Sequence, residues 1–189
     1  MTTRCCFAIA PKAPPTPVVD TPVGSALVGG APVGGALAGL VGAWTGVGHG
    51  QYPTIDPFDY LETVTFGVVT GKPFMTYVQR TSDPTTATPM HSESGYLRNP
   101  GPGKLELVVA QPTGVTEVHT GRLTTAGDDL LLDLATTSVV CTPSAKEVTA
   151  VERQWRLTGD ELTYEVSMAA VGQPMTLHLQ ATLERTVTS

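Results

Sequence analysis

The chain has few basic residues and few cysteines, and both shortages limit what it can do. Its 189 residues include 11 Lys and Arg against 17 Asp and Glu, for a formal net charge of −6. The basic residues are scattered, whereas a groove for phosphate groups needs them clustered, so we expect no nucleic-acid partner. The three cysteines, Cys5, Cys6 and Cys141, are odd in number and lack CxxC spacing. They predict no disulfide framework and favour a reducing compartment, which we expect to be the cytoplasm.

Long apolar segments are also lacking. No residue from 21 to 55 is charged, but glycine and proline dominate this segment and large apolar side chains are few. A membrane-spanning helix needs about 20 predominantly apolar residues, so we expect no membrane association. The short apolar run near the start ends at Pro11, too early for a signal-peptide core. We expect a flexible tail rich in Gly, Ala and Pro over residues 1–35, and a domain over residues 36–189 that opens with a short helical lid over 36–41.

Sustained helical periodicity is missing after this lid. Runs of aromatic and β-branched residues alternate with turn formers, and the clearest hairpin turn is Gly159-Asp160. The expected strands cover residues 42–50, 58–70, 73–81, 88–98, 104–111, 114–124, 129–140, 146–158, 161–171 and 175–187. Roughly ten strands at this spacing predict an all-β fold. Short turns between them favour an antiparallel β-barrel, because closure removes exposed strand edges.

The first of these strands, in the sequence GAWTGVGHGQYPT, is unusually rich in glycine. Alternate residues of a strand share a face, so Gly42, Trp44, Gly46 and Gly48 form one row. Glycine weakens a strand unless the strand bends sharply or another group approaches closely. The row therefore predicts a structural strand of a barrel with a buried tryptophan.

Common catalytic motifs are absent. The four histidines, His49, His91, His119 and His178, show neither HxxxH nor HExxH spacing, so a zinc site would have to be assembled across strands. The chain contains no GxSxG motif, and GVGHGQ lacks the Lys-Ser/Thr of a P-loop. We predict that His49, His91 and His119 are structural or exposed.

His178 allows two arrangements of the last strand. It shares a face with Thr176, Gln180 and Thr182. The other face carries Leu177, Leu179, Ala181 and Leu183. Simple alternation puts the leucines in the core and His178 outside. In the alternative arrangement His178 lines a cavity, and the leucines pack under the lid or against a second subunit. Packing against a second subunit would make the protein a homodimer.

These segments together resemble the nitrobindin family, small haem-binding β-barrels similar in shape to fatty-acid-binding proteins and lipocalins. GAWTGVGHGQYPTI matches the GxWxGxGxGxYPT signature of that family. Further agreement comes from PFDYLETVTF, GKPFMTYVQRT, HSESGYLR, SAKEVTAVER, LTYEVSMAAVGQP and HLQATLER. The resemblance covers residues 36–186 and points to the actinobacterial members.

The resemblance implies a cofactor, a reaction and three site residues. His178 corresponds to the proximal ligand of the haem iron, Thr54 to a residue near the haem, and Lys146 to the partner of a haem propionate. A lysine at the wet edge of a barrel suits that anion. Family members hold one ferric haem b per chain with an open sixth position, bind nitric oxide and isomerise peroxynitrite to nitrate. A ferric iron with one free position acts as a Lewis acid toward that anion.

Two other functions compete with this one. The first is a carrier of fatty acid or another small apolar ligand, since such barrels also begin with a Gly-x-Trp strand. A carrier usually buries an arginine pair that binds the ligand's carboxylate. The arginines of the chain are scattered among polar neighbours: Arg80, Arg98, Arg122, Arg153, Arg156 and Arg185. The second alternative is a structural or partner-binding barrel without a cofactor.

Overall fold

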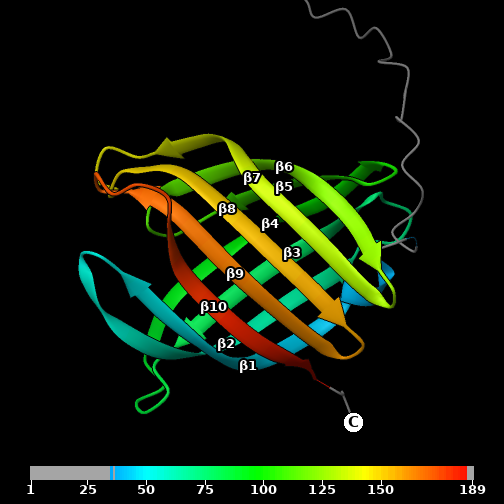
Figure 1. Ribbon diagram of the computed structural model, residues 1–189, viewed down its shortest axis with the longest axis horizontal. Coiled ribbons are helices and arrows are strands. Elements are labelled where there is room, and N and C mark those ends of the chain that lie inside the picture. Colours follow the sequence, from blue (N-terminus) through cyan, green and yellow to red (C-terminus); the bar gives the residue numbers. More distant parts are fainter. Residues whose placement is uncertain (1–34, 36, 187–189) are drawn as a thin grey trace, which may run out of the picture.

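The computed structural model describes Gly35 and residues 37–186, so the rest of the predicted tail and Ala36 lie outside the described residues. A 3-10 helix, η1 (Ala38–Leu40), precedes ten strands. The strands are β1 (Gly42–Tyr52), β2 (Ile55–Val68), β3 (Phe74–Ser82), β4 (Pro89–Gly101), β5 (Lys104–Ala110), β6 (Val115–Ala126), β7 (Asp129–Cys141), β8 (Val148–Thr158), β9 (Glu161–Ala170) and β10 (Thr176–Arg185). Each strand pairs with the next, and β1 pairs with β10, so the sheet closes into an antiparallel barrel (Figure 1). The predicted all-β, ten-stranded barrel is confirmed.

Most strand boundaries lie within a few residues of the predicted ones. The largest early start is in β2, which begins at Ile55 rather than at residue 58, because Tyr52 pairs directly with Ile55 across a tight turn. Pro57 therefore lies inside a strand, near its end, where the loss of one backbone donor is tolerated. Among the residues that the structure describes, no helix is long and apolar enough to cross a membrane.

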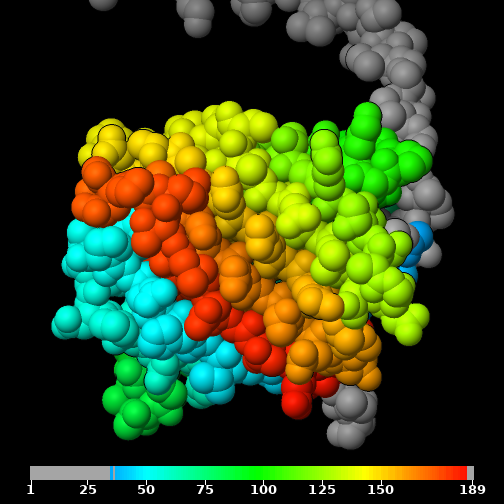
Figure 2. Space-filling model, in the orientation of Figure 1, coloured from blue at the N-terminus to red at the C-terminus, as the bar shows by residue number. Residues whose placement is uncertain are grey.

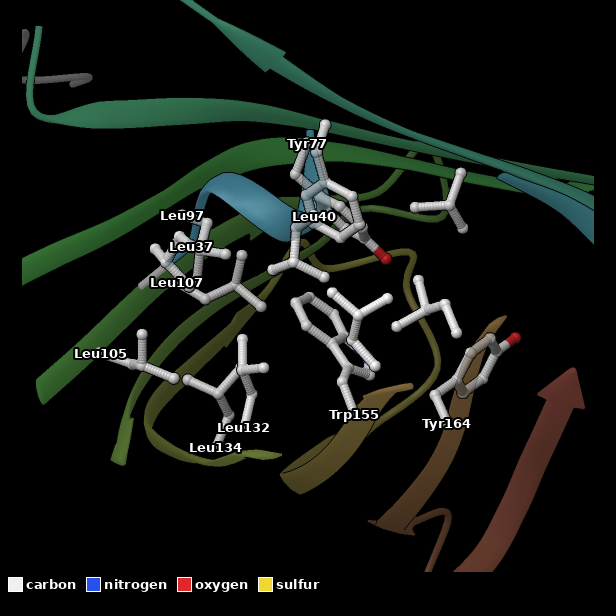
Figure 3. Close-up of a cluster of buried hydrophobic side chains, with 14 of the residues drawn as sticks. Leu37, Leu40, Tyr77, Leu97, Leu105, Leu107, Leu132, Leu134, Trp155 and Tyr164 are labelled. Carbon is white, nitrogen blue, oxygen red and sulfur yellow. The ribbon is translucent and has the colours of Figure 1, made fainter. Parts of the chain in front are cut away.

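The two ends of the barrel differ. The helix η1 covers one end, where the buried side chains of Leu37 and Leu40 extend the hydrophobic core (Figure 3). The predicted helical lid is therefore a single 3-10 turn. The opposite end, on the left in Figure 1, is surrounded by the β1–β2, β7–β8 and β9–β10 connections. Because one end is closed by packing, the open end is the place where a ligand can enter.

The glycines of β1 leave space for groups from the neighbouring strands. A Cβ on Gly48 would lie 2.2 Å from the ring of Tyr60, and one on Gly50 would lie 2.2 Å from the ring of Phe58. Each of these rings belongs to the residue directly opposite on β2. Gly46 approaches β10 so closely that its Cβ would meet a backbone carbonyl at 2.1 Å. The glycine-rich row thus allows aromatic side chains to cover β1 from inside, as cross-strand aromatic residues do elsewhere.

Trp44, the one large side chain of this row, joins the barrel to η1. Its side chain is fully buried, and its indole Nε1 donates a hydrogen bond of 2.9 Å to the carbonyl of Leu40. The guanidinium of Arg185, on β10, lies 4.1 Å from the centre of the ring. Trp44 therefore connects the first strand, the last strand and the covering helix.

We expect the Trp44→Ala substitution to lower the free energy of unfolding by about 3–5 kcal/mol, because it leaves a large cavity in a close-packed core. Trp44→Phe should cost less, since it keeps an aromatic ring and removes the hydrogen bond to Leu40. Urea denaturation measures both effects. Tyr96→Ala is the control, because the Tyr96 side chain is 52% exposed. A loss for Trp44→Ala no greater than that of the control would contradict this placement.

Candidate functional site

The open end of the barrel leads into a cavity of about 250 Å³. Its wall contains Phe58, Tyr60, Gln79, Thr81, Met90, His91, Glu93, Gln111, Glu117, Val148, Val151, Arg153, Val166, Met168, His178 and Leu179. The two largest hollows, of about 690 and 600 Å³, are open depressions lined mainly by outward-facing side chains of the strands. Figure 2 shows the outer face on which β8, β9, β10 and β1 follow one another around the barrel. The inner cavity is the candidate site because it alone of these three combines enclosure with converging polar groups.

His178 reaches the cavity because β10 is irregular at this residue. The pairing of β10 with β9 shifts between Leu177 and Leu179, so that His178 has no partner in the ladder. Such a bulge adds one residue to a strand and can redirect a side chain. Leu179 packs against the hydrophobic core, and both it and His178 line the cavity. The two arrangements that strict alternation offers are therefore both incomplete, since the leucine and the histidine point inward together.

This geometry removes the reason for expecting a dimer through the leucine face. Ala181 and Leu183 are buried in the barrel core, and Leu179 packs against that core. The last strand therefore presents no row of leucines to a second subunit.

A second irregularity, in β1, fixes the orientation of the His178 ring. The pairing of β1 with β2 shifts between Gly50 and Tyr52, which leaves Gln51 out of that ladder. The carbonyl oxygen of Gln51 lies 2.9 Å from Nδ1 of His178. A carbonyl only accepts hydrogen bonds, so Nδ1 carries the proton and Nε2 keeps its lone pair. The ring of Tyr52 packs edge-on against the imidazole, with 5.3 Å between the ring centres.

The surroundings of His178 also favour its neutral form. Burial lowers the pKa of His178, the nearby His91 lowers it further, and the hydrogen bond to Gln51 acts in the opposite direction. Neutral imidazole is the form that binds metals. Phe58 packs near its ring, with 6.4 Å between the ring centres. His178 is thus a half-buried, oriented nitrogen donor on the wall of an apolar cavity mouth.

Thr54 and Lys146 lie at the open end of the barrel but not on the cavity wall. Thr54 is exposed in the β1–β2 turn, two positions after Tyr52, which contacts His178. Lys146 is exposed in the β7–β8 connection. The carbonyl of the next residue, Glu147, accepts a hydrogen bond of 3.0 Å from the backbone of the β9–β10 connection. Both residues therefore belong to the loops around the open end.

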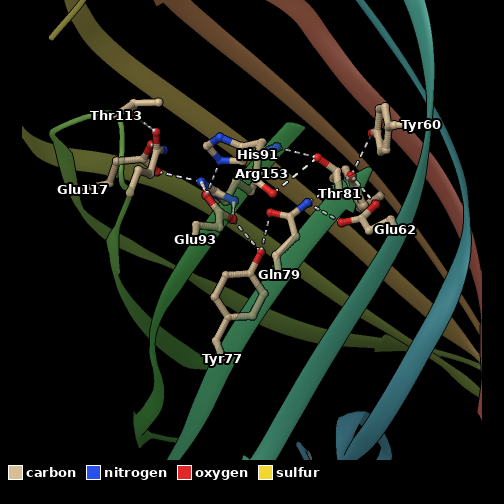
Figure 4. A network of polar contacts seen from close by, with 12 residues as sticks. Tyr60, Glu62, Tyr77, Gln79, Thr81, His91, Glu93, Thr113, Glu117 and Arg153 are labelled. Atoms are coloured by element: carbon tan, nitrogen blue, oxygen red, sulfur yellow. Dashed lines mark hydrogen bonds and ion pairs between the residues drawn. The ribbon is translucent and has the colours of Figure 1, made fainter. Parts of the chain in front are cut away.

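The floor of the cavity is a buried ionic cluster (Figure 4). Arg153 donates from Nη1 to Glu93 at 2.6 Å, and its Nη2 contacts Glu93 at 3.0 Å and Glu117 at 2.8 Å. Nε2 of His119 lies 2.8 Å from Glu117, and Tyr77 donates to Glu93 at 2.6 Å. All five side chains are buried. One guanidinium thus holds two carboxylates inside the barrel.

The pKa values of these groups follow from their pairing. Burial raises the pKa of Glu93 and of Glu117, but the charge of Arg153 and the hydrogen bonds to the two carboxylates together outweigh this effect and hold both pKa values below the ordinary value of a carboxyl. Burial lowers the pKa of Arg153, and the two carboxylates more than reverse this, so that its pKa is raised. All three groups are therefore ionised at neutral pH.

Glu62 is a third buried carboxyl and contacts no cation. It accepts hydrogen bonds from the amide nitrogen of Gln79 and, at 2.6 Å, from the hydroxyl of Tyr164. Burial raises the pKa of Glu62 to about 7, although both hydrogen bonds lower it. Burial thus brings the protonated form of this carboxyl into the neutral pH range.

The other histidines take three different positions. His49 is partly exposed and lies 2.8 Å from Asp59. His119 is fully buried in the ionic cluster, as a structural role predicts. His91 differs from the expectation, because it lines the same cavity as His178. Its Nε2 lies 3.8 Å from Glu93, too far for a hydrogen bond. Among the described residues no group of three or more His, Cys, Asp or Glu could hold a metal ion.

Sequence reasoning missed the ionic floor, although alternation contained a signal. Arg153 shares a strand face with Trp155 and Leu157, and Glu93 shares one with Leu97. Arg153 is therefore buried in the barrel, whereas the sequence suggested that it is one of several arginines scattered among polar neighbours. A charged residue in phase with core residues on two strands indicates a buried pair.

Known proteins agree with the fold and with the predicted resemblance. The family described as "THAP4-like, heme-binding beta-barrel domain" matches residues 34–185. "Peroxynitrite isomerase 1" of Mycolicibacterium paratuberculosis is 55% identical over 79% of this chain and 92% of its own length. "Peroxynitrite isomerase" of Nocardia farcinica is 51% identical over 79% of this chain and 88% of its own length. The crystal structure of Rv2717c from M. tuberculosis superposes with a TM-score of 0.80 at 50% identity, over 83% of this chain and 99% of that one. This chain therefore belongs to the family of THAP4-like, heme-binding β-barrel domains, as its resemblance to the nitrobindins predicts.

Proposed function

We propose that the protein holds one ferric haem b per chain through His178 and isomerises peroxynitrite to nitrate. The observation that carries this proposal is the oriented imidazole. Nδ1 of His178 donates a hydrogen bond to Gln51, so the lone pair of Nε2 is available to bind iron at the cavity. Metal-bound histidines commonly have such a second partner. The donor set of the cavity therefore suits a haem, and relatives more than half identical to this chain are named peroxynitrite isomerases.

The protein's part in this reaction is to bind, orient and enclose. A haem held there would supply Lewis-acid chemistry toward the peroxynitrite anion and would also provide a site for nitric oxide. His178 holds the iron, while Phe58, Met168 and Leu179 provide an apolar wall beside it. We place Thr54 beside the haem and Lys146 at a propionate, and this placement is supported by their positions in the loops around the open end.

The carrier hypothesis has no support from the cavity. A fatty-acid carrier needs a buried cation free to bind the carboxylate of its ligand. The one arginine on the cavity wall, Arg153, already binds Glu93 and Glu117. Arg153 is therefore already paired and is not free to bind the carboxylate of a fatty acid.

The compartment and the oligomeric state belong to the same proposal. We place the protein in the cytoplasm, since its cysteine content favours a reducing compartment and Cys141 forms no disulfide within the part of the chain that the structure describes. A homodimer remains a hypothesis for size-exclusion chromatography with light scattering, and its interface would have to use a surface other than the leucines of β10.

Hemin titration of the purified protein tests the function. We expect a Soret band that saturates at one haem per chain, and faster decay of peroxynitrite with nitrate as the product. A colourless protein that rejects hemin and retains fatty acid would instead support the carrier.

We expect Lys146→Ala to weaken haem retention by less than about fivefold and to leave the fold intact, because an exposed ion pair contributes about 0–1 kcal/mol. The loss should shrink as salt is added, since salt screens exposed charges. Hemin transfer to apomyoglobin at two ionic strengths measures the effect. Lys104→Ala is the matched control, because this exposed lysine starts β5 at the opposite end of the barrel. Complete loss of haem would show that Lys146 has a larger role than pairing with a propionate.

A further inference from the structure

The interior of the barrel contains more acid than base. The buried residues include three glutamates, Glu62, Glu93 and Glu117, but a single arginine, Arg153. Arg153 contacts Glu93 and Glu117 directly, and it makes no contact with Glu62. A buried carboxylate without a cation is costly, whereas the protonated acid is not. Glu62 is therefore the buried carboxyl that can exchange a proton without breaking an ion pair.

Glu62 does not line the cavity, but a chain of hydroxyl groups connects it to the cavity wall. Tyr164 donates to Glu62 at 2.6 Å, and the hydroxyl oxygens of Tyr164 and Tyr60 lie 2.8 Å apart. Tyr60 is a wall residue, and its hydroxyl also lies 3.4 Å from the backbone carbonyl of Gln180. Figure 4 shows Tyr60 and Glu62 on the same side of the network, away from Arg153 and Glu117.

This chain has two complete hydrogen-bond directions. With Glu62 ionised, Tyr60 donates to Tyr164 and Tyr164 donates to the carboxylate. With Glu62 protonated, the acid donates to Tyr164, Tyr164 donates to Tyr60, and Tyr60 turns to the carbonyl of Gln180. Both protonation states of Glu62 are thus served by the same three side chains.

We propose that Glu62 is the proton-exchanging group of the cavity and that Tyr164 and Tyr60 carry the proton between Glu62 and a ligand bound there. The proposal rests on the proposed function for the identity of that ligand, an anion in equilibrium with its conjugate acid. When peroxynitrous acid enters, its O–H bond breaks as its proton passes to Tyr60. Tyr60 gives its own proton to Tyr164, and Tyr164 gives its proton to Glu62, so each step breaks one O–H bond and forms one. The peroxynitrite anion remains in the cavity, nitrate leaves as an anion, and Glu62 returns the proton to solvent by the same path.

The groups that face Glu62 agree with this role. Tyr60 lies on β2, the same strand as Glu62. The other groups are Tyr77 and Gln79 on β3, Glu93 on β4, Arg153 on β8 and Tyr164 on β9. The charges of Glu93 and Arg153 act on Glu62 in opposite directions. Burial raises the pKa values of Tyr60, Tyr77 and Tyr164, so all three hydroxyls stay protonated, and Tyr60 and Tyr164 can pass a proton on without a lasting charge. Glu62 is the member of this set whose pKa lies near neutral, at about 7.

The first experiment uses the full chain without haem. Isotope-edited infrared spectroscopy of ¹³C-glutamate-labelled protein should show one protonated carboxyl that titrates with a midpoint near 7. The Glu62→Gln substitution should remove this band, and Glu152→Gln, at an exposed glutamate of β8, should leave it unchanged. Glutamine is isosteric with the protonated acid, so Glu62→Gln should fold. Absence of the band, or its persistence in Glu62→Gln, would overturn the proposal whatever the protein's function.

The second experiment uses the haem-loaded chain with azide as a stable anion. Azide binding near pH 7 should draw a fractional proton from solvent, because a nearby negative charge raises the pKa of Glu62. A pH indicator in weak buffer should show this uptake in the unmodified protein and in Glu152→Gln, and its loss in Glu62→Gln. Tyr60→Phe should slow the uptake in stopped-flow. Equal uptake in Glu62→Gln, or an unchanged rate in Tyr60→Phe, would overturn the proposal. A protein that binds no hemin would contradict the proposed function instead, and the titration of the haem-free chain then decides the proposal alone.

Discussion

The His178→Ala protein should fold as the unmodified barrel does and bind hemin more than about 100-fold more weakly. The side chain of His178 is only half-buried and lies on the cavity wall, so its removal leaves the core packing intact. Removal of a residue that only hydrogen-bonds to a metal ligand commonly lowers metal affinity by about 10–100-fold, and removal of the ligand itself should lower it more. The Soret band should shift or disappear on hemin addition, and peroxynitrite should decay as in buffer.

Two controls separate loss of the ligand from general damage. Free imidazole should restore part of the Soret band, because the space left by the side chain has the size of the missing ring. His49→Ala should leave the spectrum unchanged, since His49 lies on the outside of the barrel and pairs with Asp59. His91 is unsuitable as a control, because it lines the cavity. If His178→Ala keeps both its haem spectrum and the isomerase rate, the proposed role of His178 is wrong.

The sequence allowed the barrel to be predicted because strand and turn signals are local. Alternation, turn residues and the hairpin at Gly159-Asp160 specify ten strands, and each strand then pairs with its neighbour in the chain. The glycine row predicts close approach, and the structure identifies the approaching groups as the rings of Tyr60 and Phe58. Such partners lie on another strand and depend on the register, which a single segment does not reveal.

The orientation of His178 could not be predicted from alternation because a period of two has no place for an inserted residue. The bulge at His178 lets Leu179 and the histidine both face inward, and the freed carbonyl of Gln51 comes from a second bulge on another strand. Only the family resemblance pointed to this residue. The resemblance likewise pointed to Thr54 and Lys146, which lie in the β1–β2 and β7–β8 connections at the open end.

The Arg153→Met protein should lose about 3–5 kcal/mol of unfolding free energy at neutral pH, because it leaves Glu93 and Glu117 buried without a cation. The pH dependence gives the sharper test. In the unmodified protein the pKa values of both carboxyls are lowered, so their contribution to stability is present above the ordinary carboxyl pKa and is lost as the pH falls through the lowered values. In Arg153→Met burial becomes the dominant effect and raises both pKa values, although the hydrogen bonds from Tyr77 and His119 remain, so the variant should lose stability as the pH rises. The difference between the two proteins should therefore widen from about pH 5 to pH 7 in urea denaturation.

A double-mutant cycle shows whether the missing charge causes this loss. Glu93→Gln removes one carboxylate, so it should harm the unmodified protein and relieve the Arg153→Met protein. Arg122→Met is the control for the loss of an arginine, because Arg122 is exposed on β6. If the two substitutions add without coupling, or if Arg153→Met loses the same stability at both pH values, the buried cluster is held by packing rather than by charge. Effects of Glu93→Gln with opposite signs in the two backgrounds would instead show that Arg153 is the counterion that allows a haem-binding barrel to bury two carboxylates beneath its cavity.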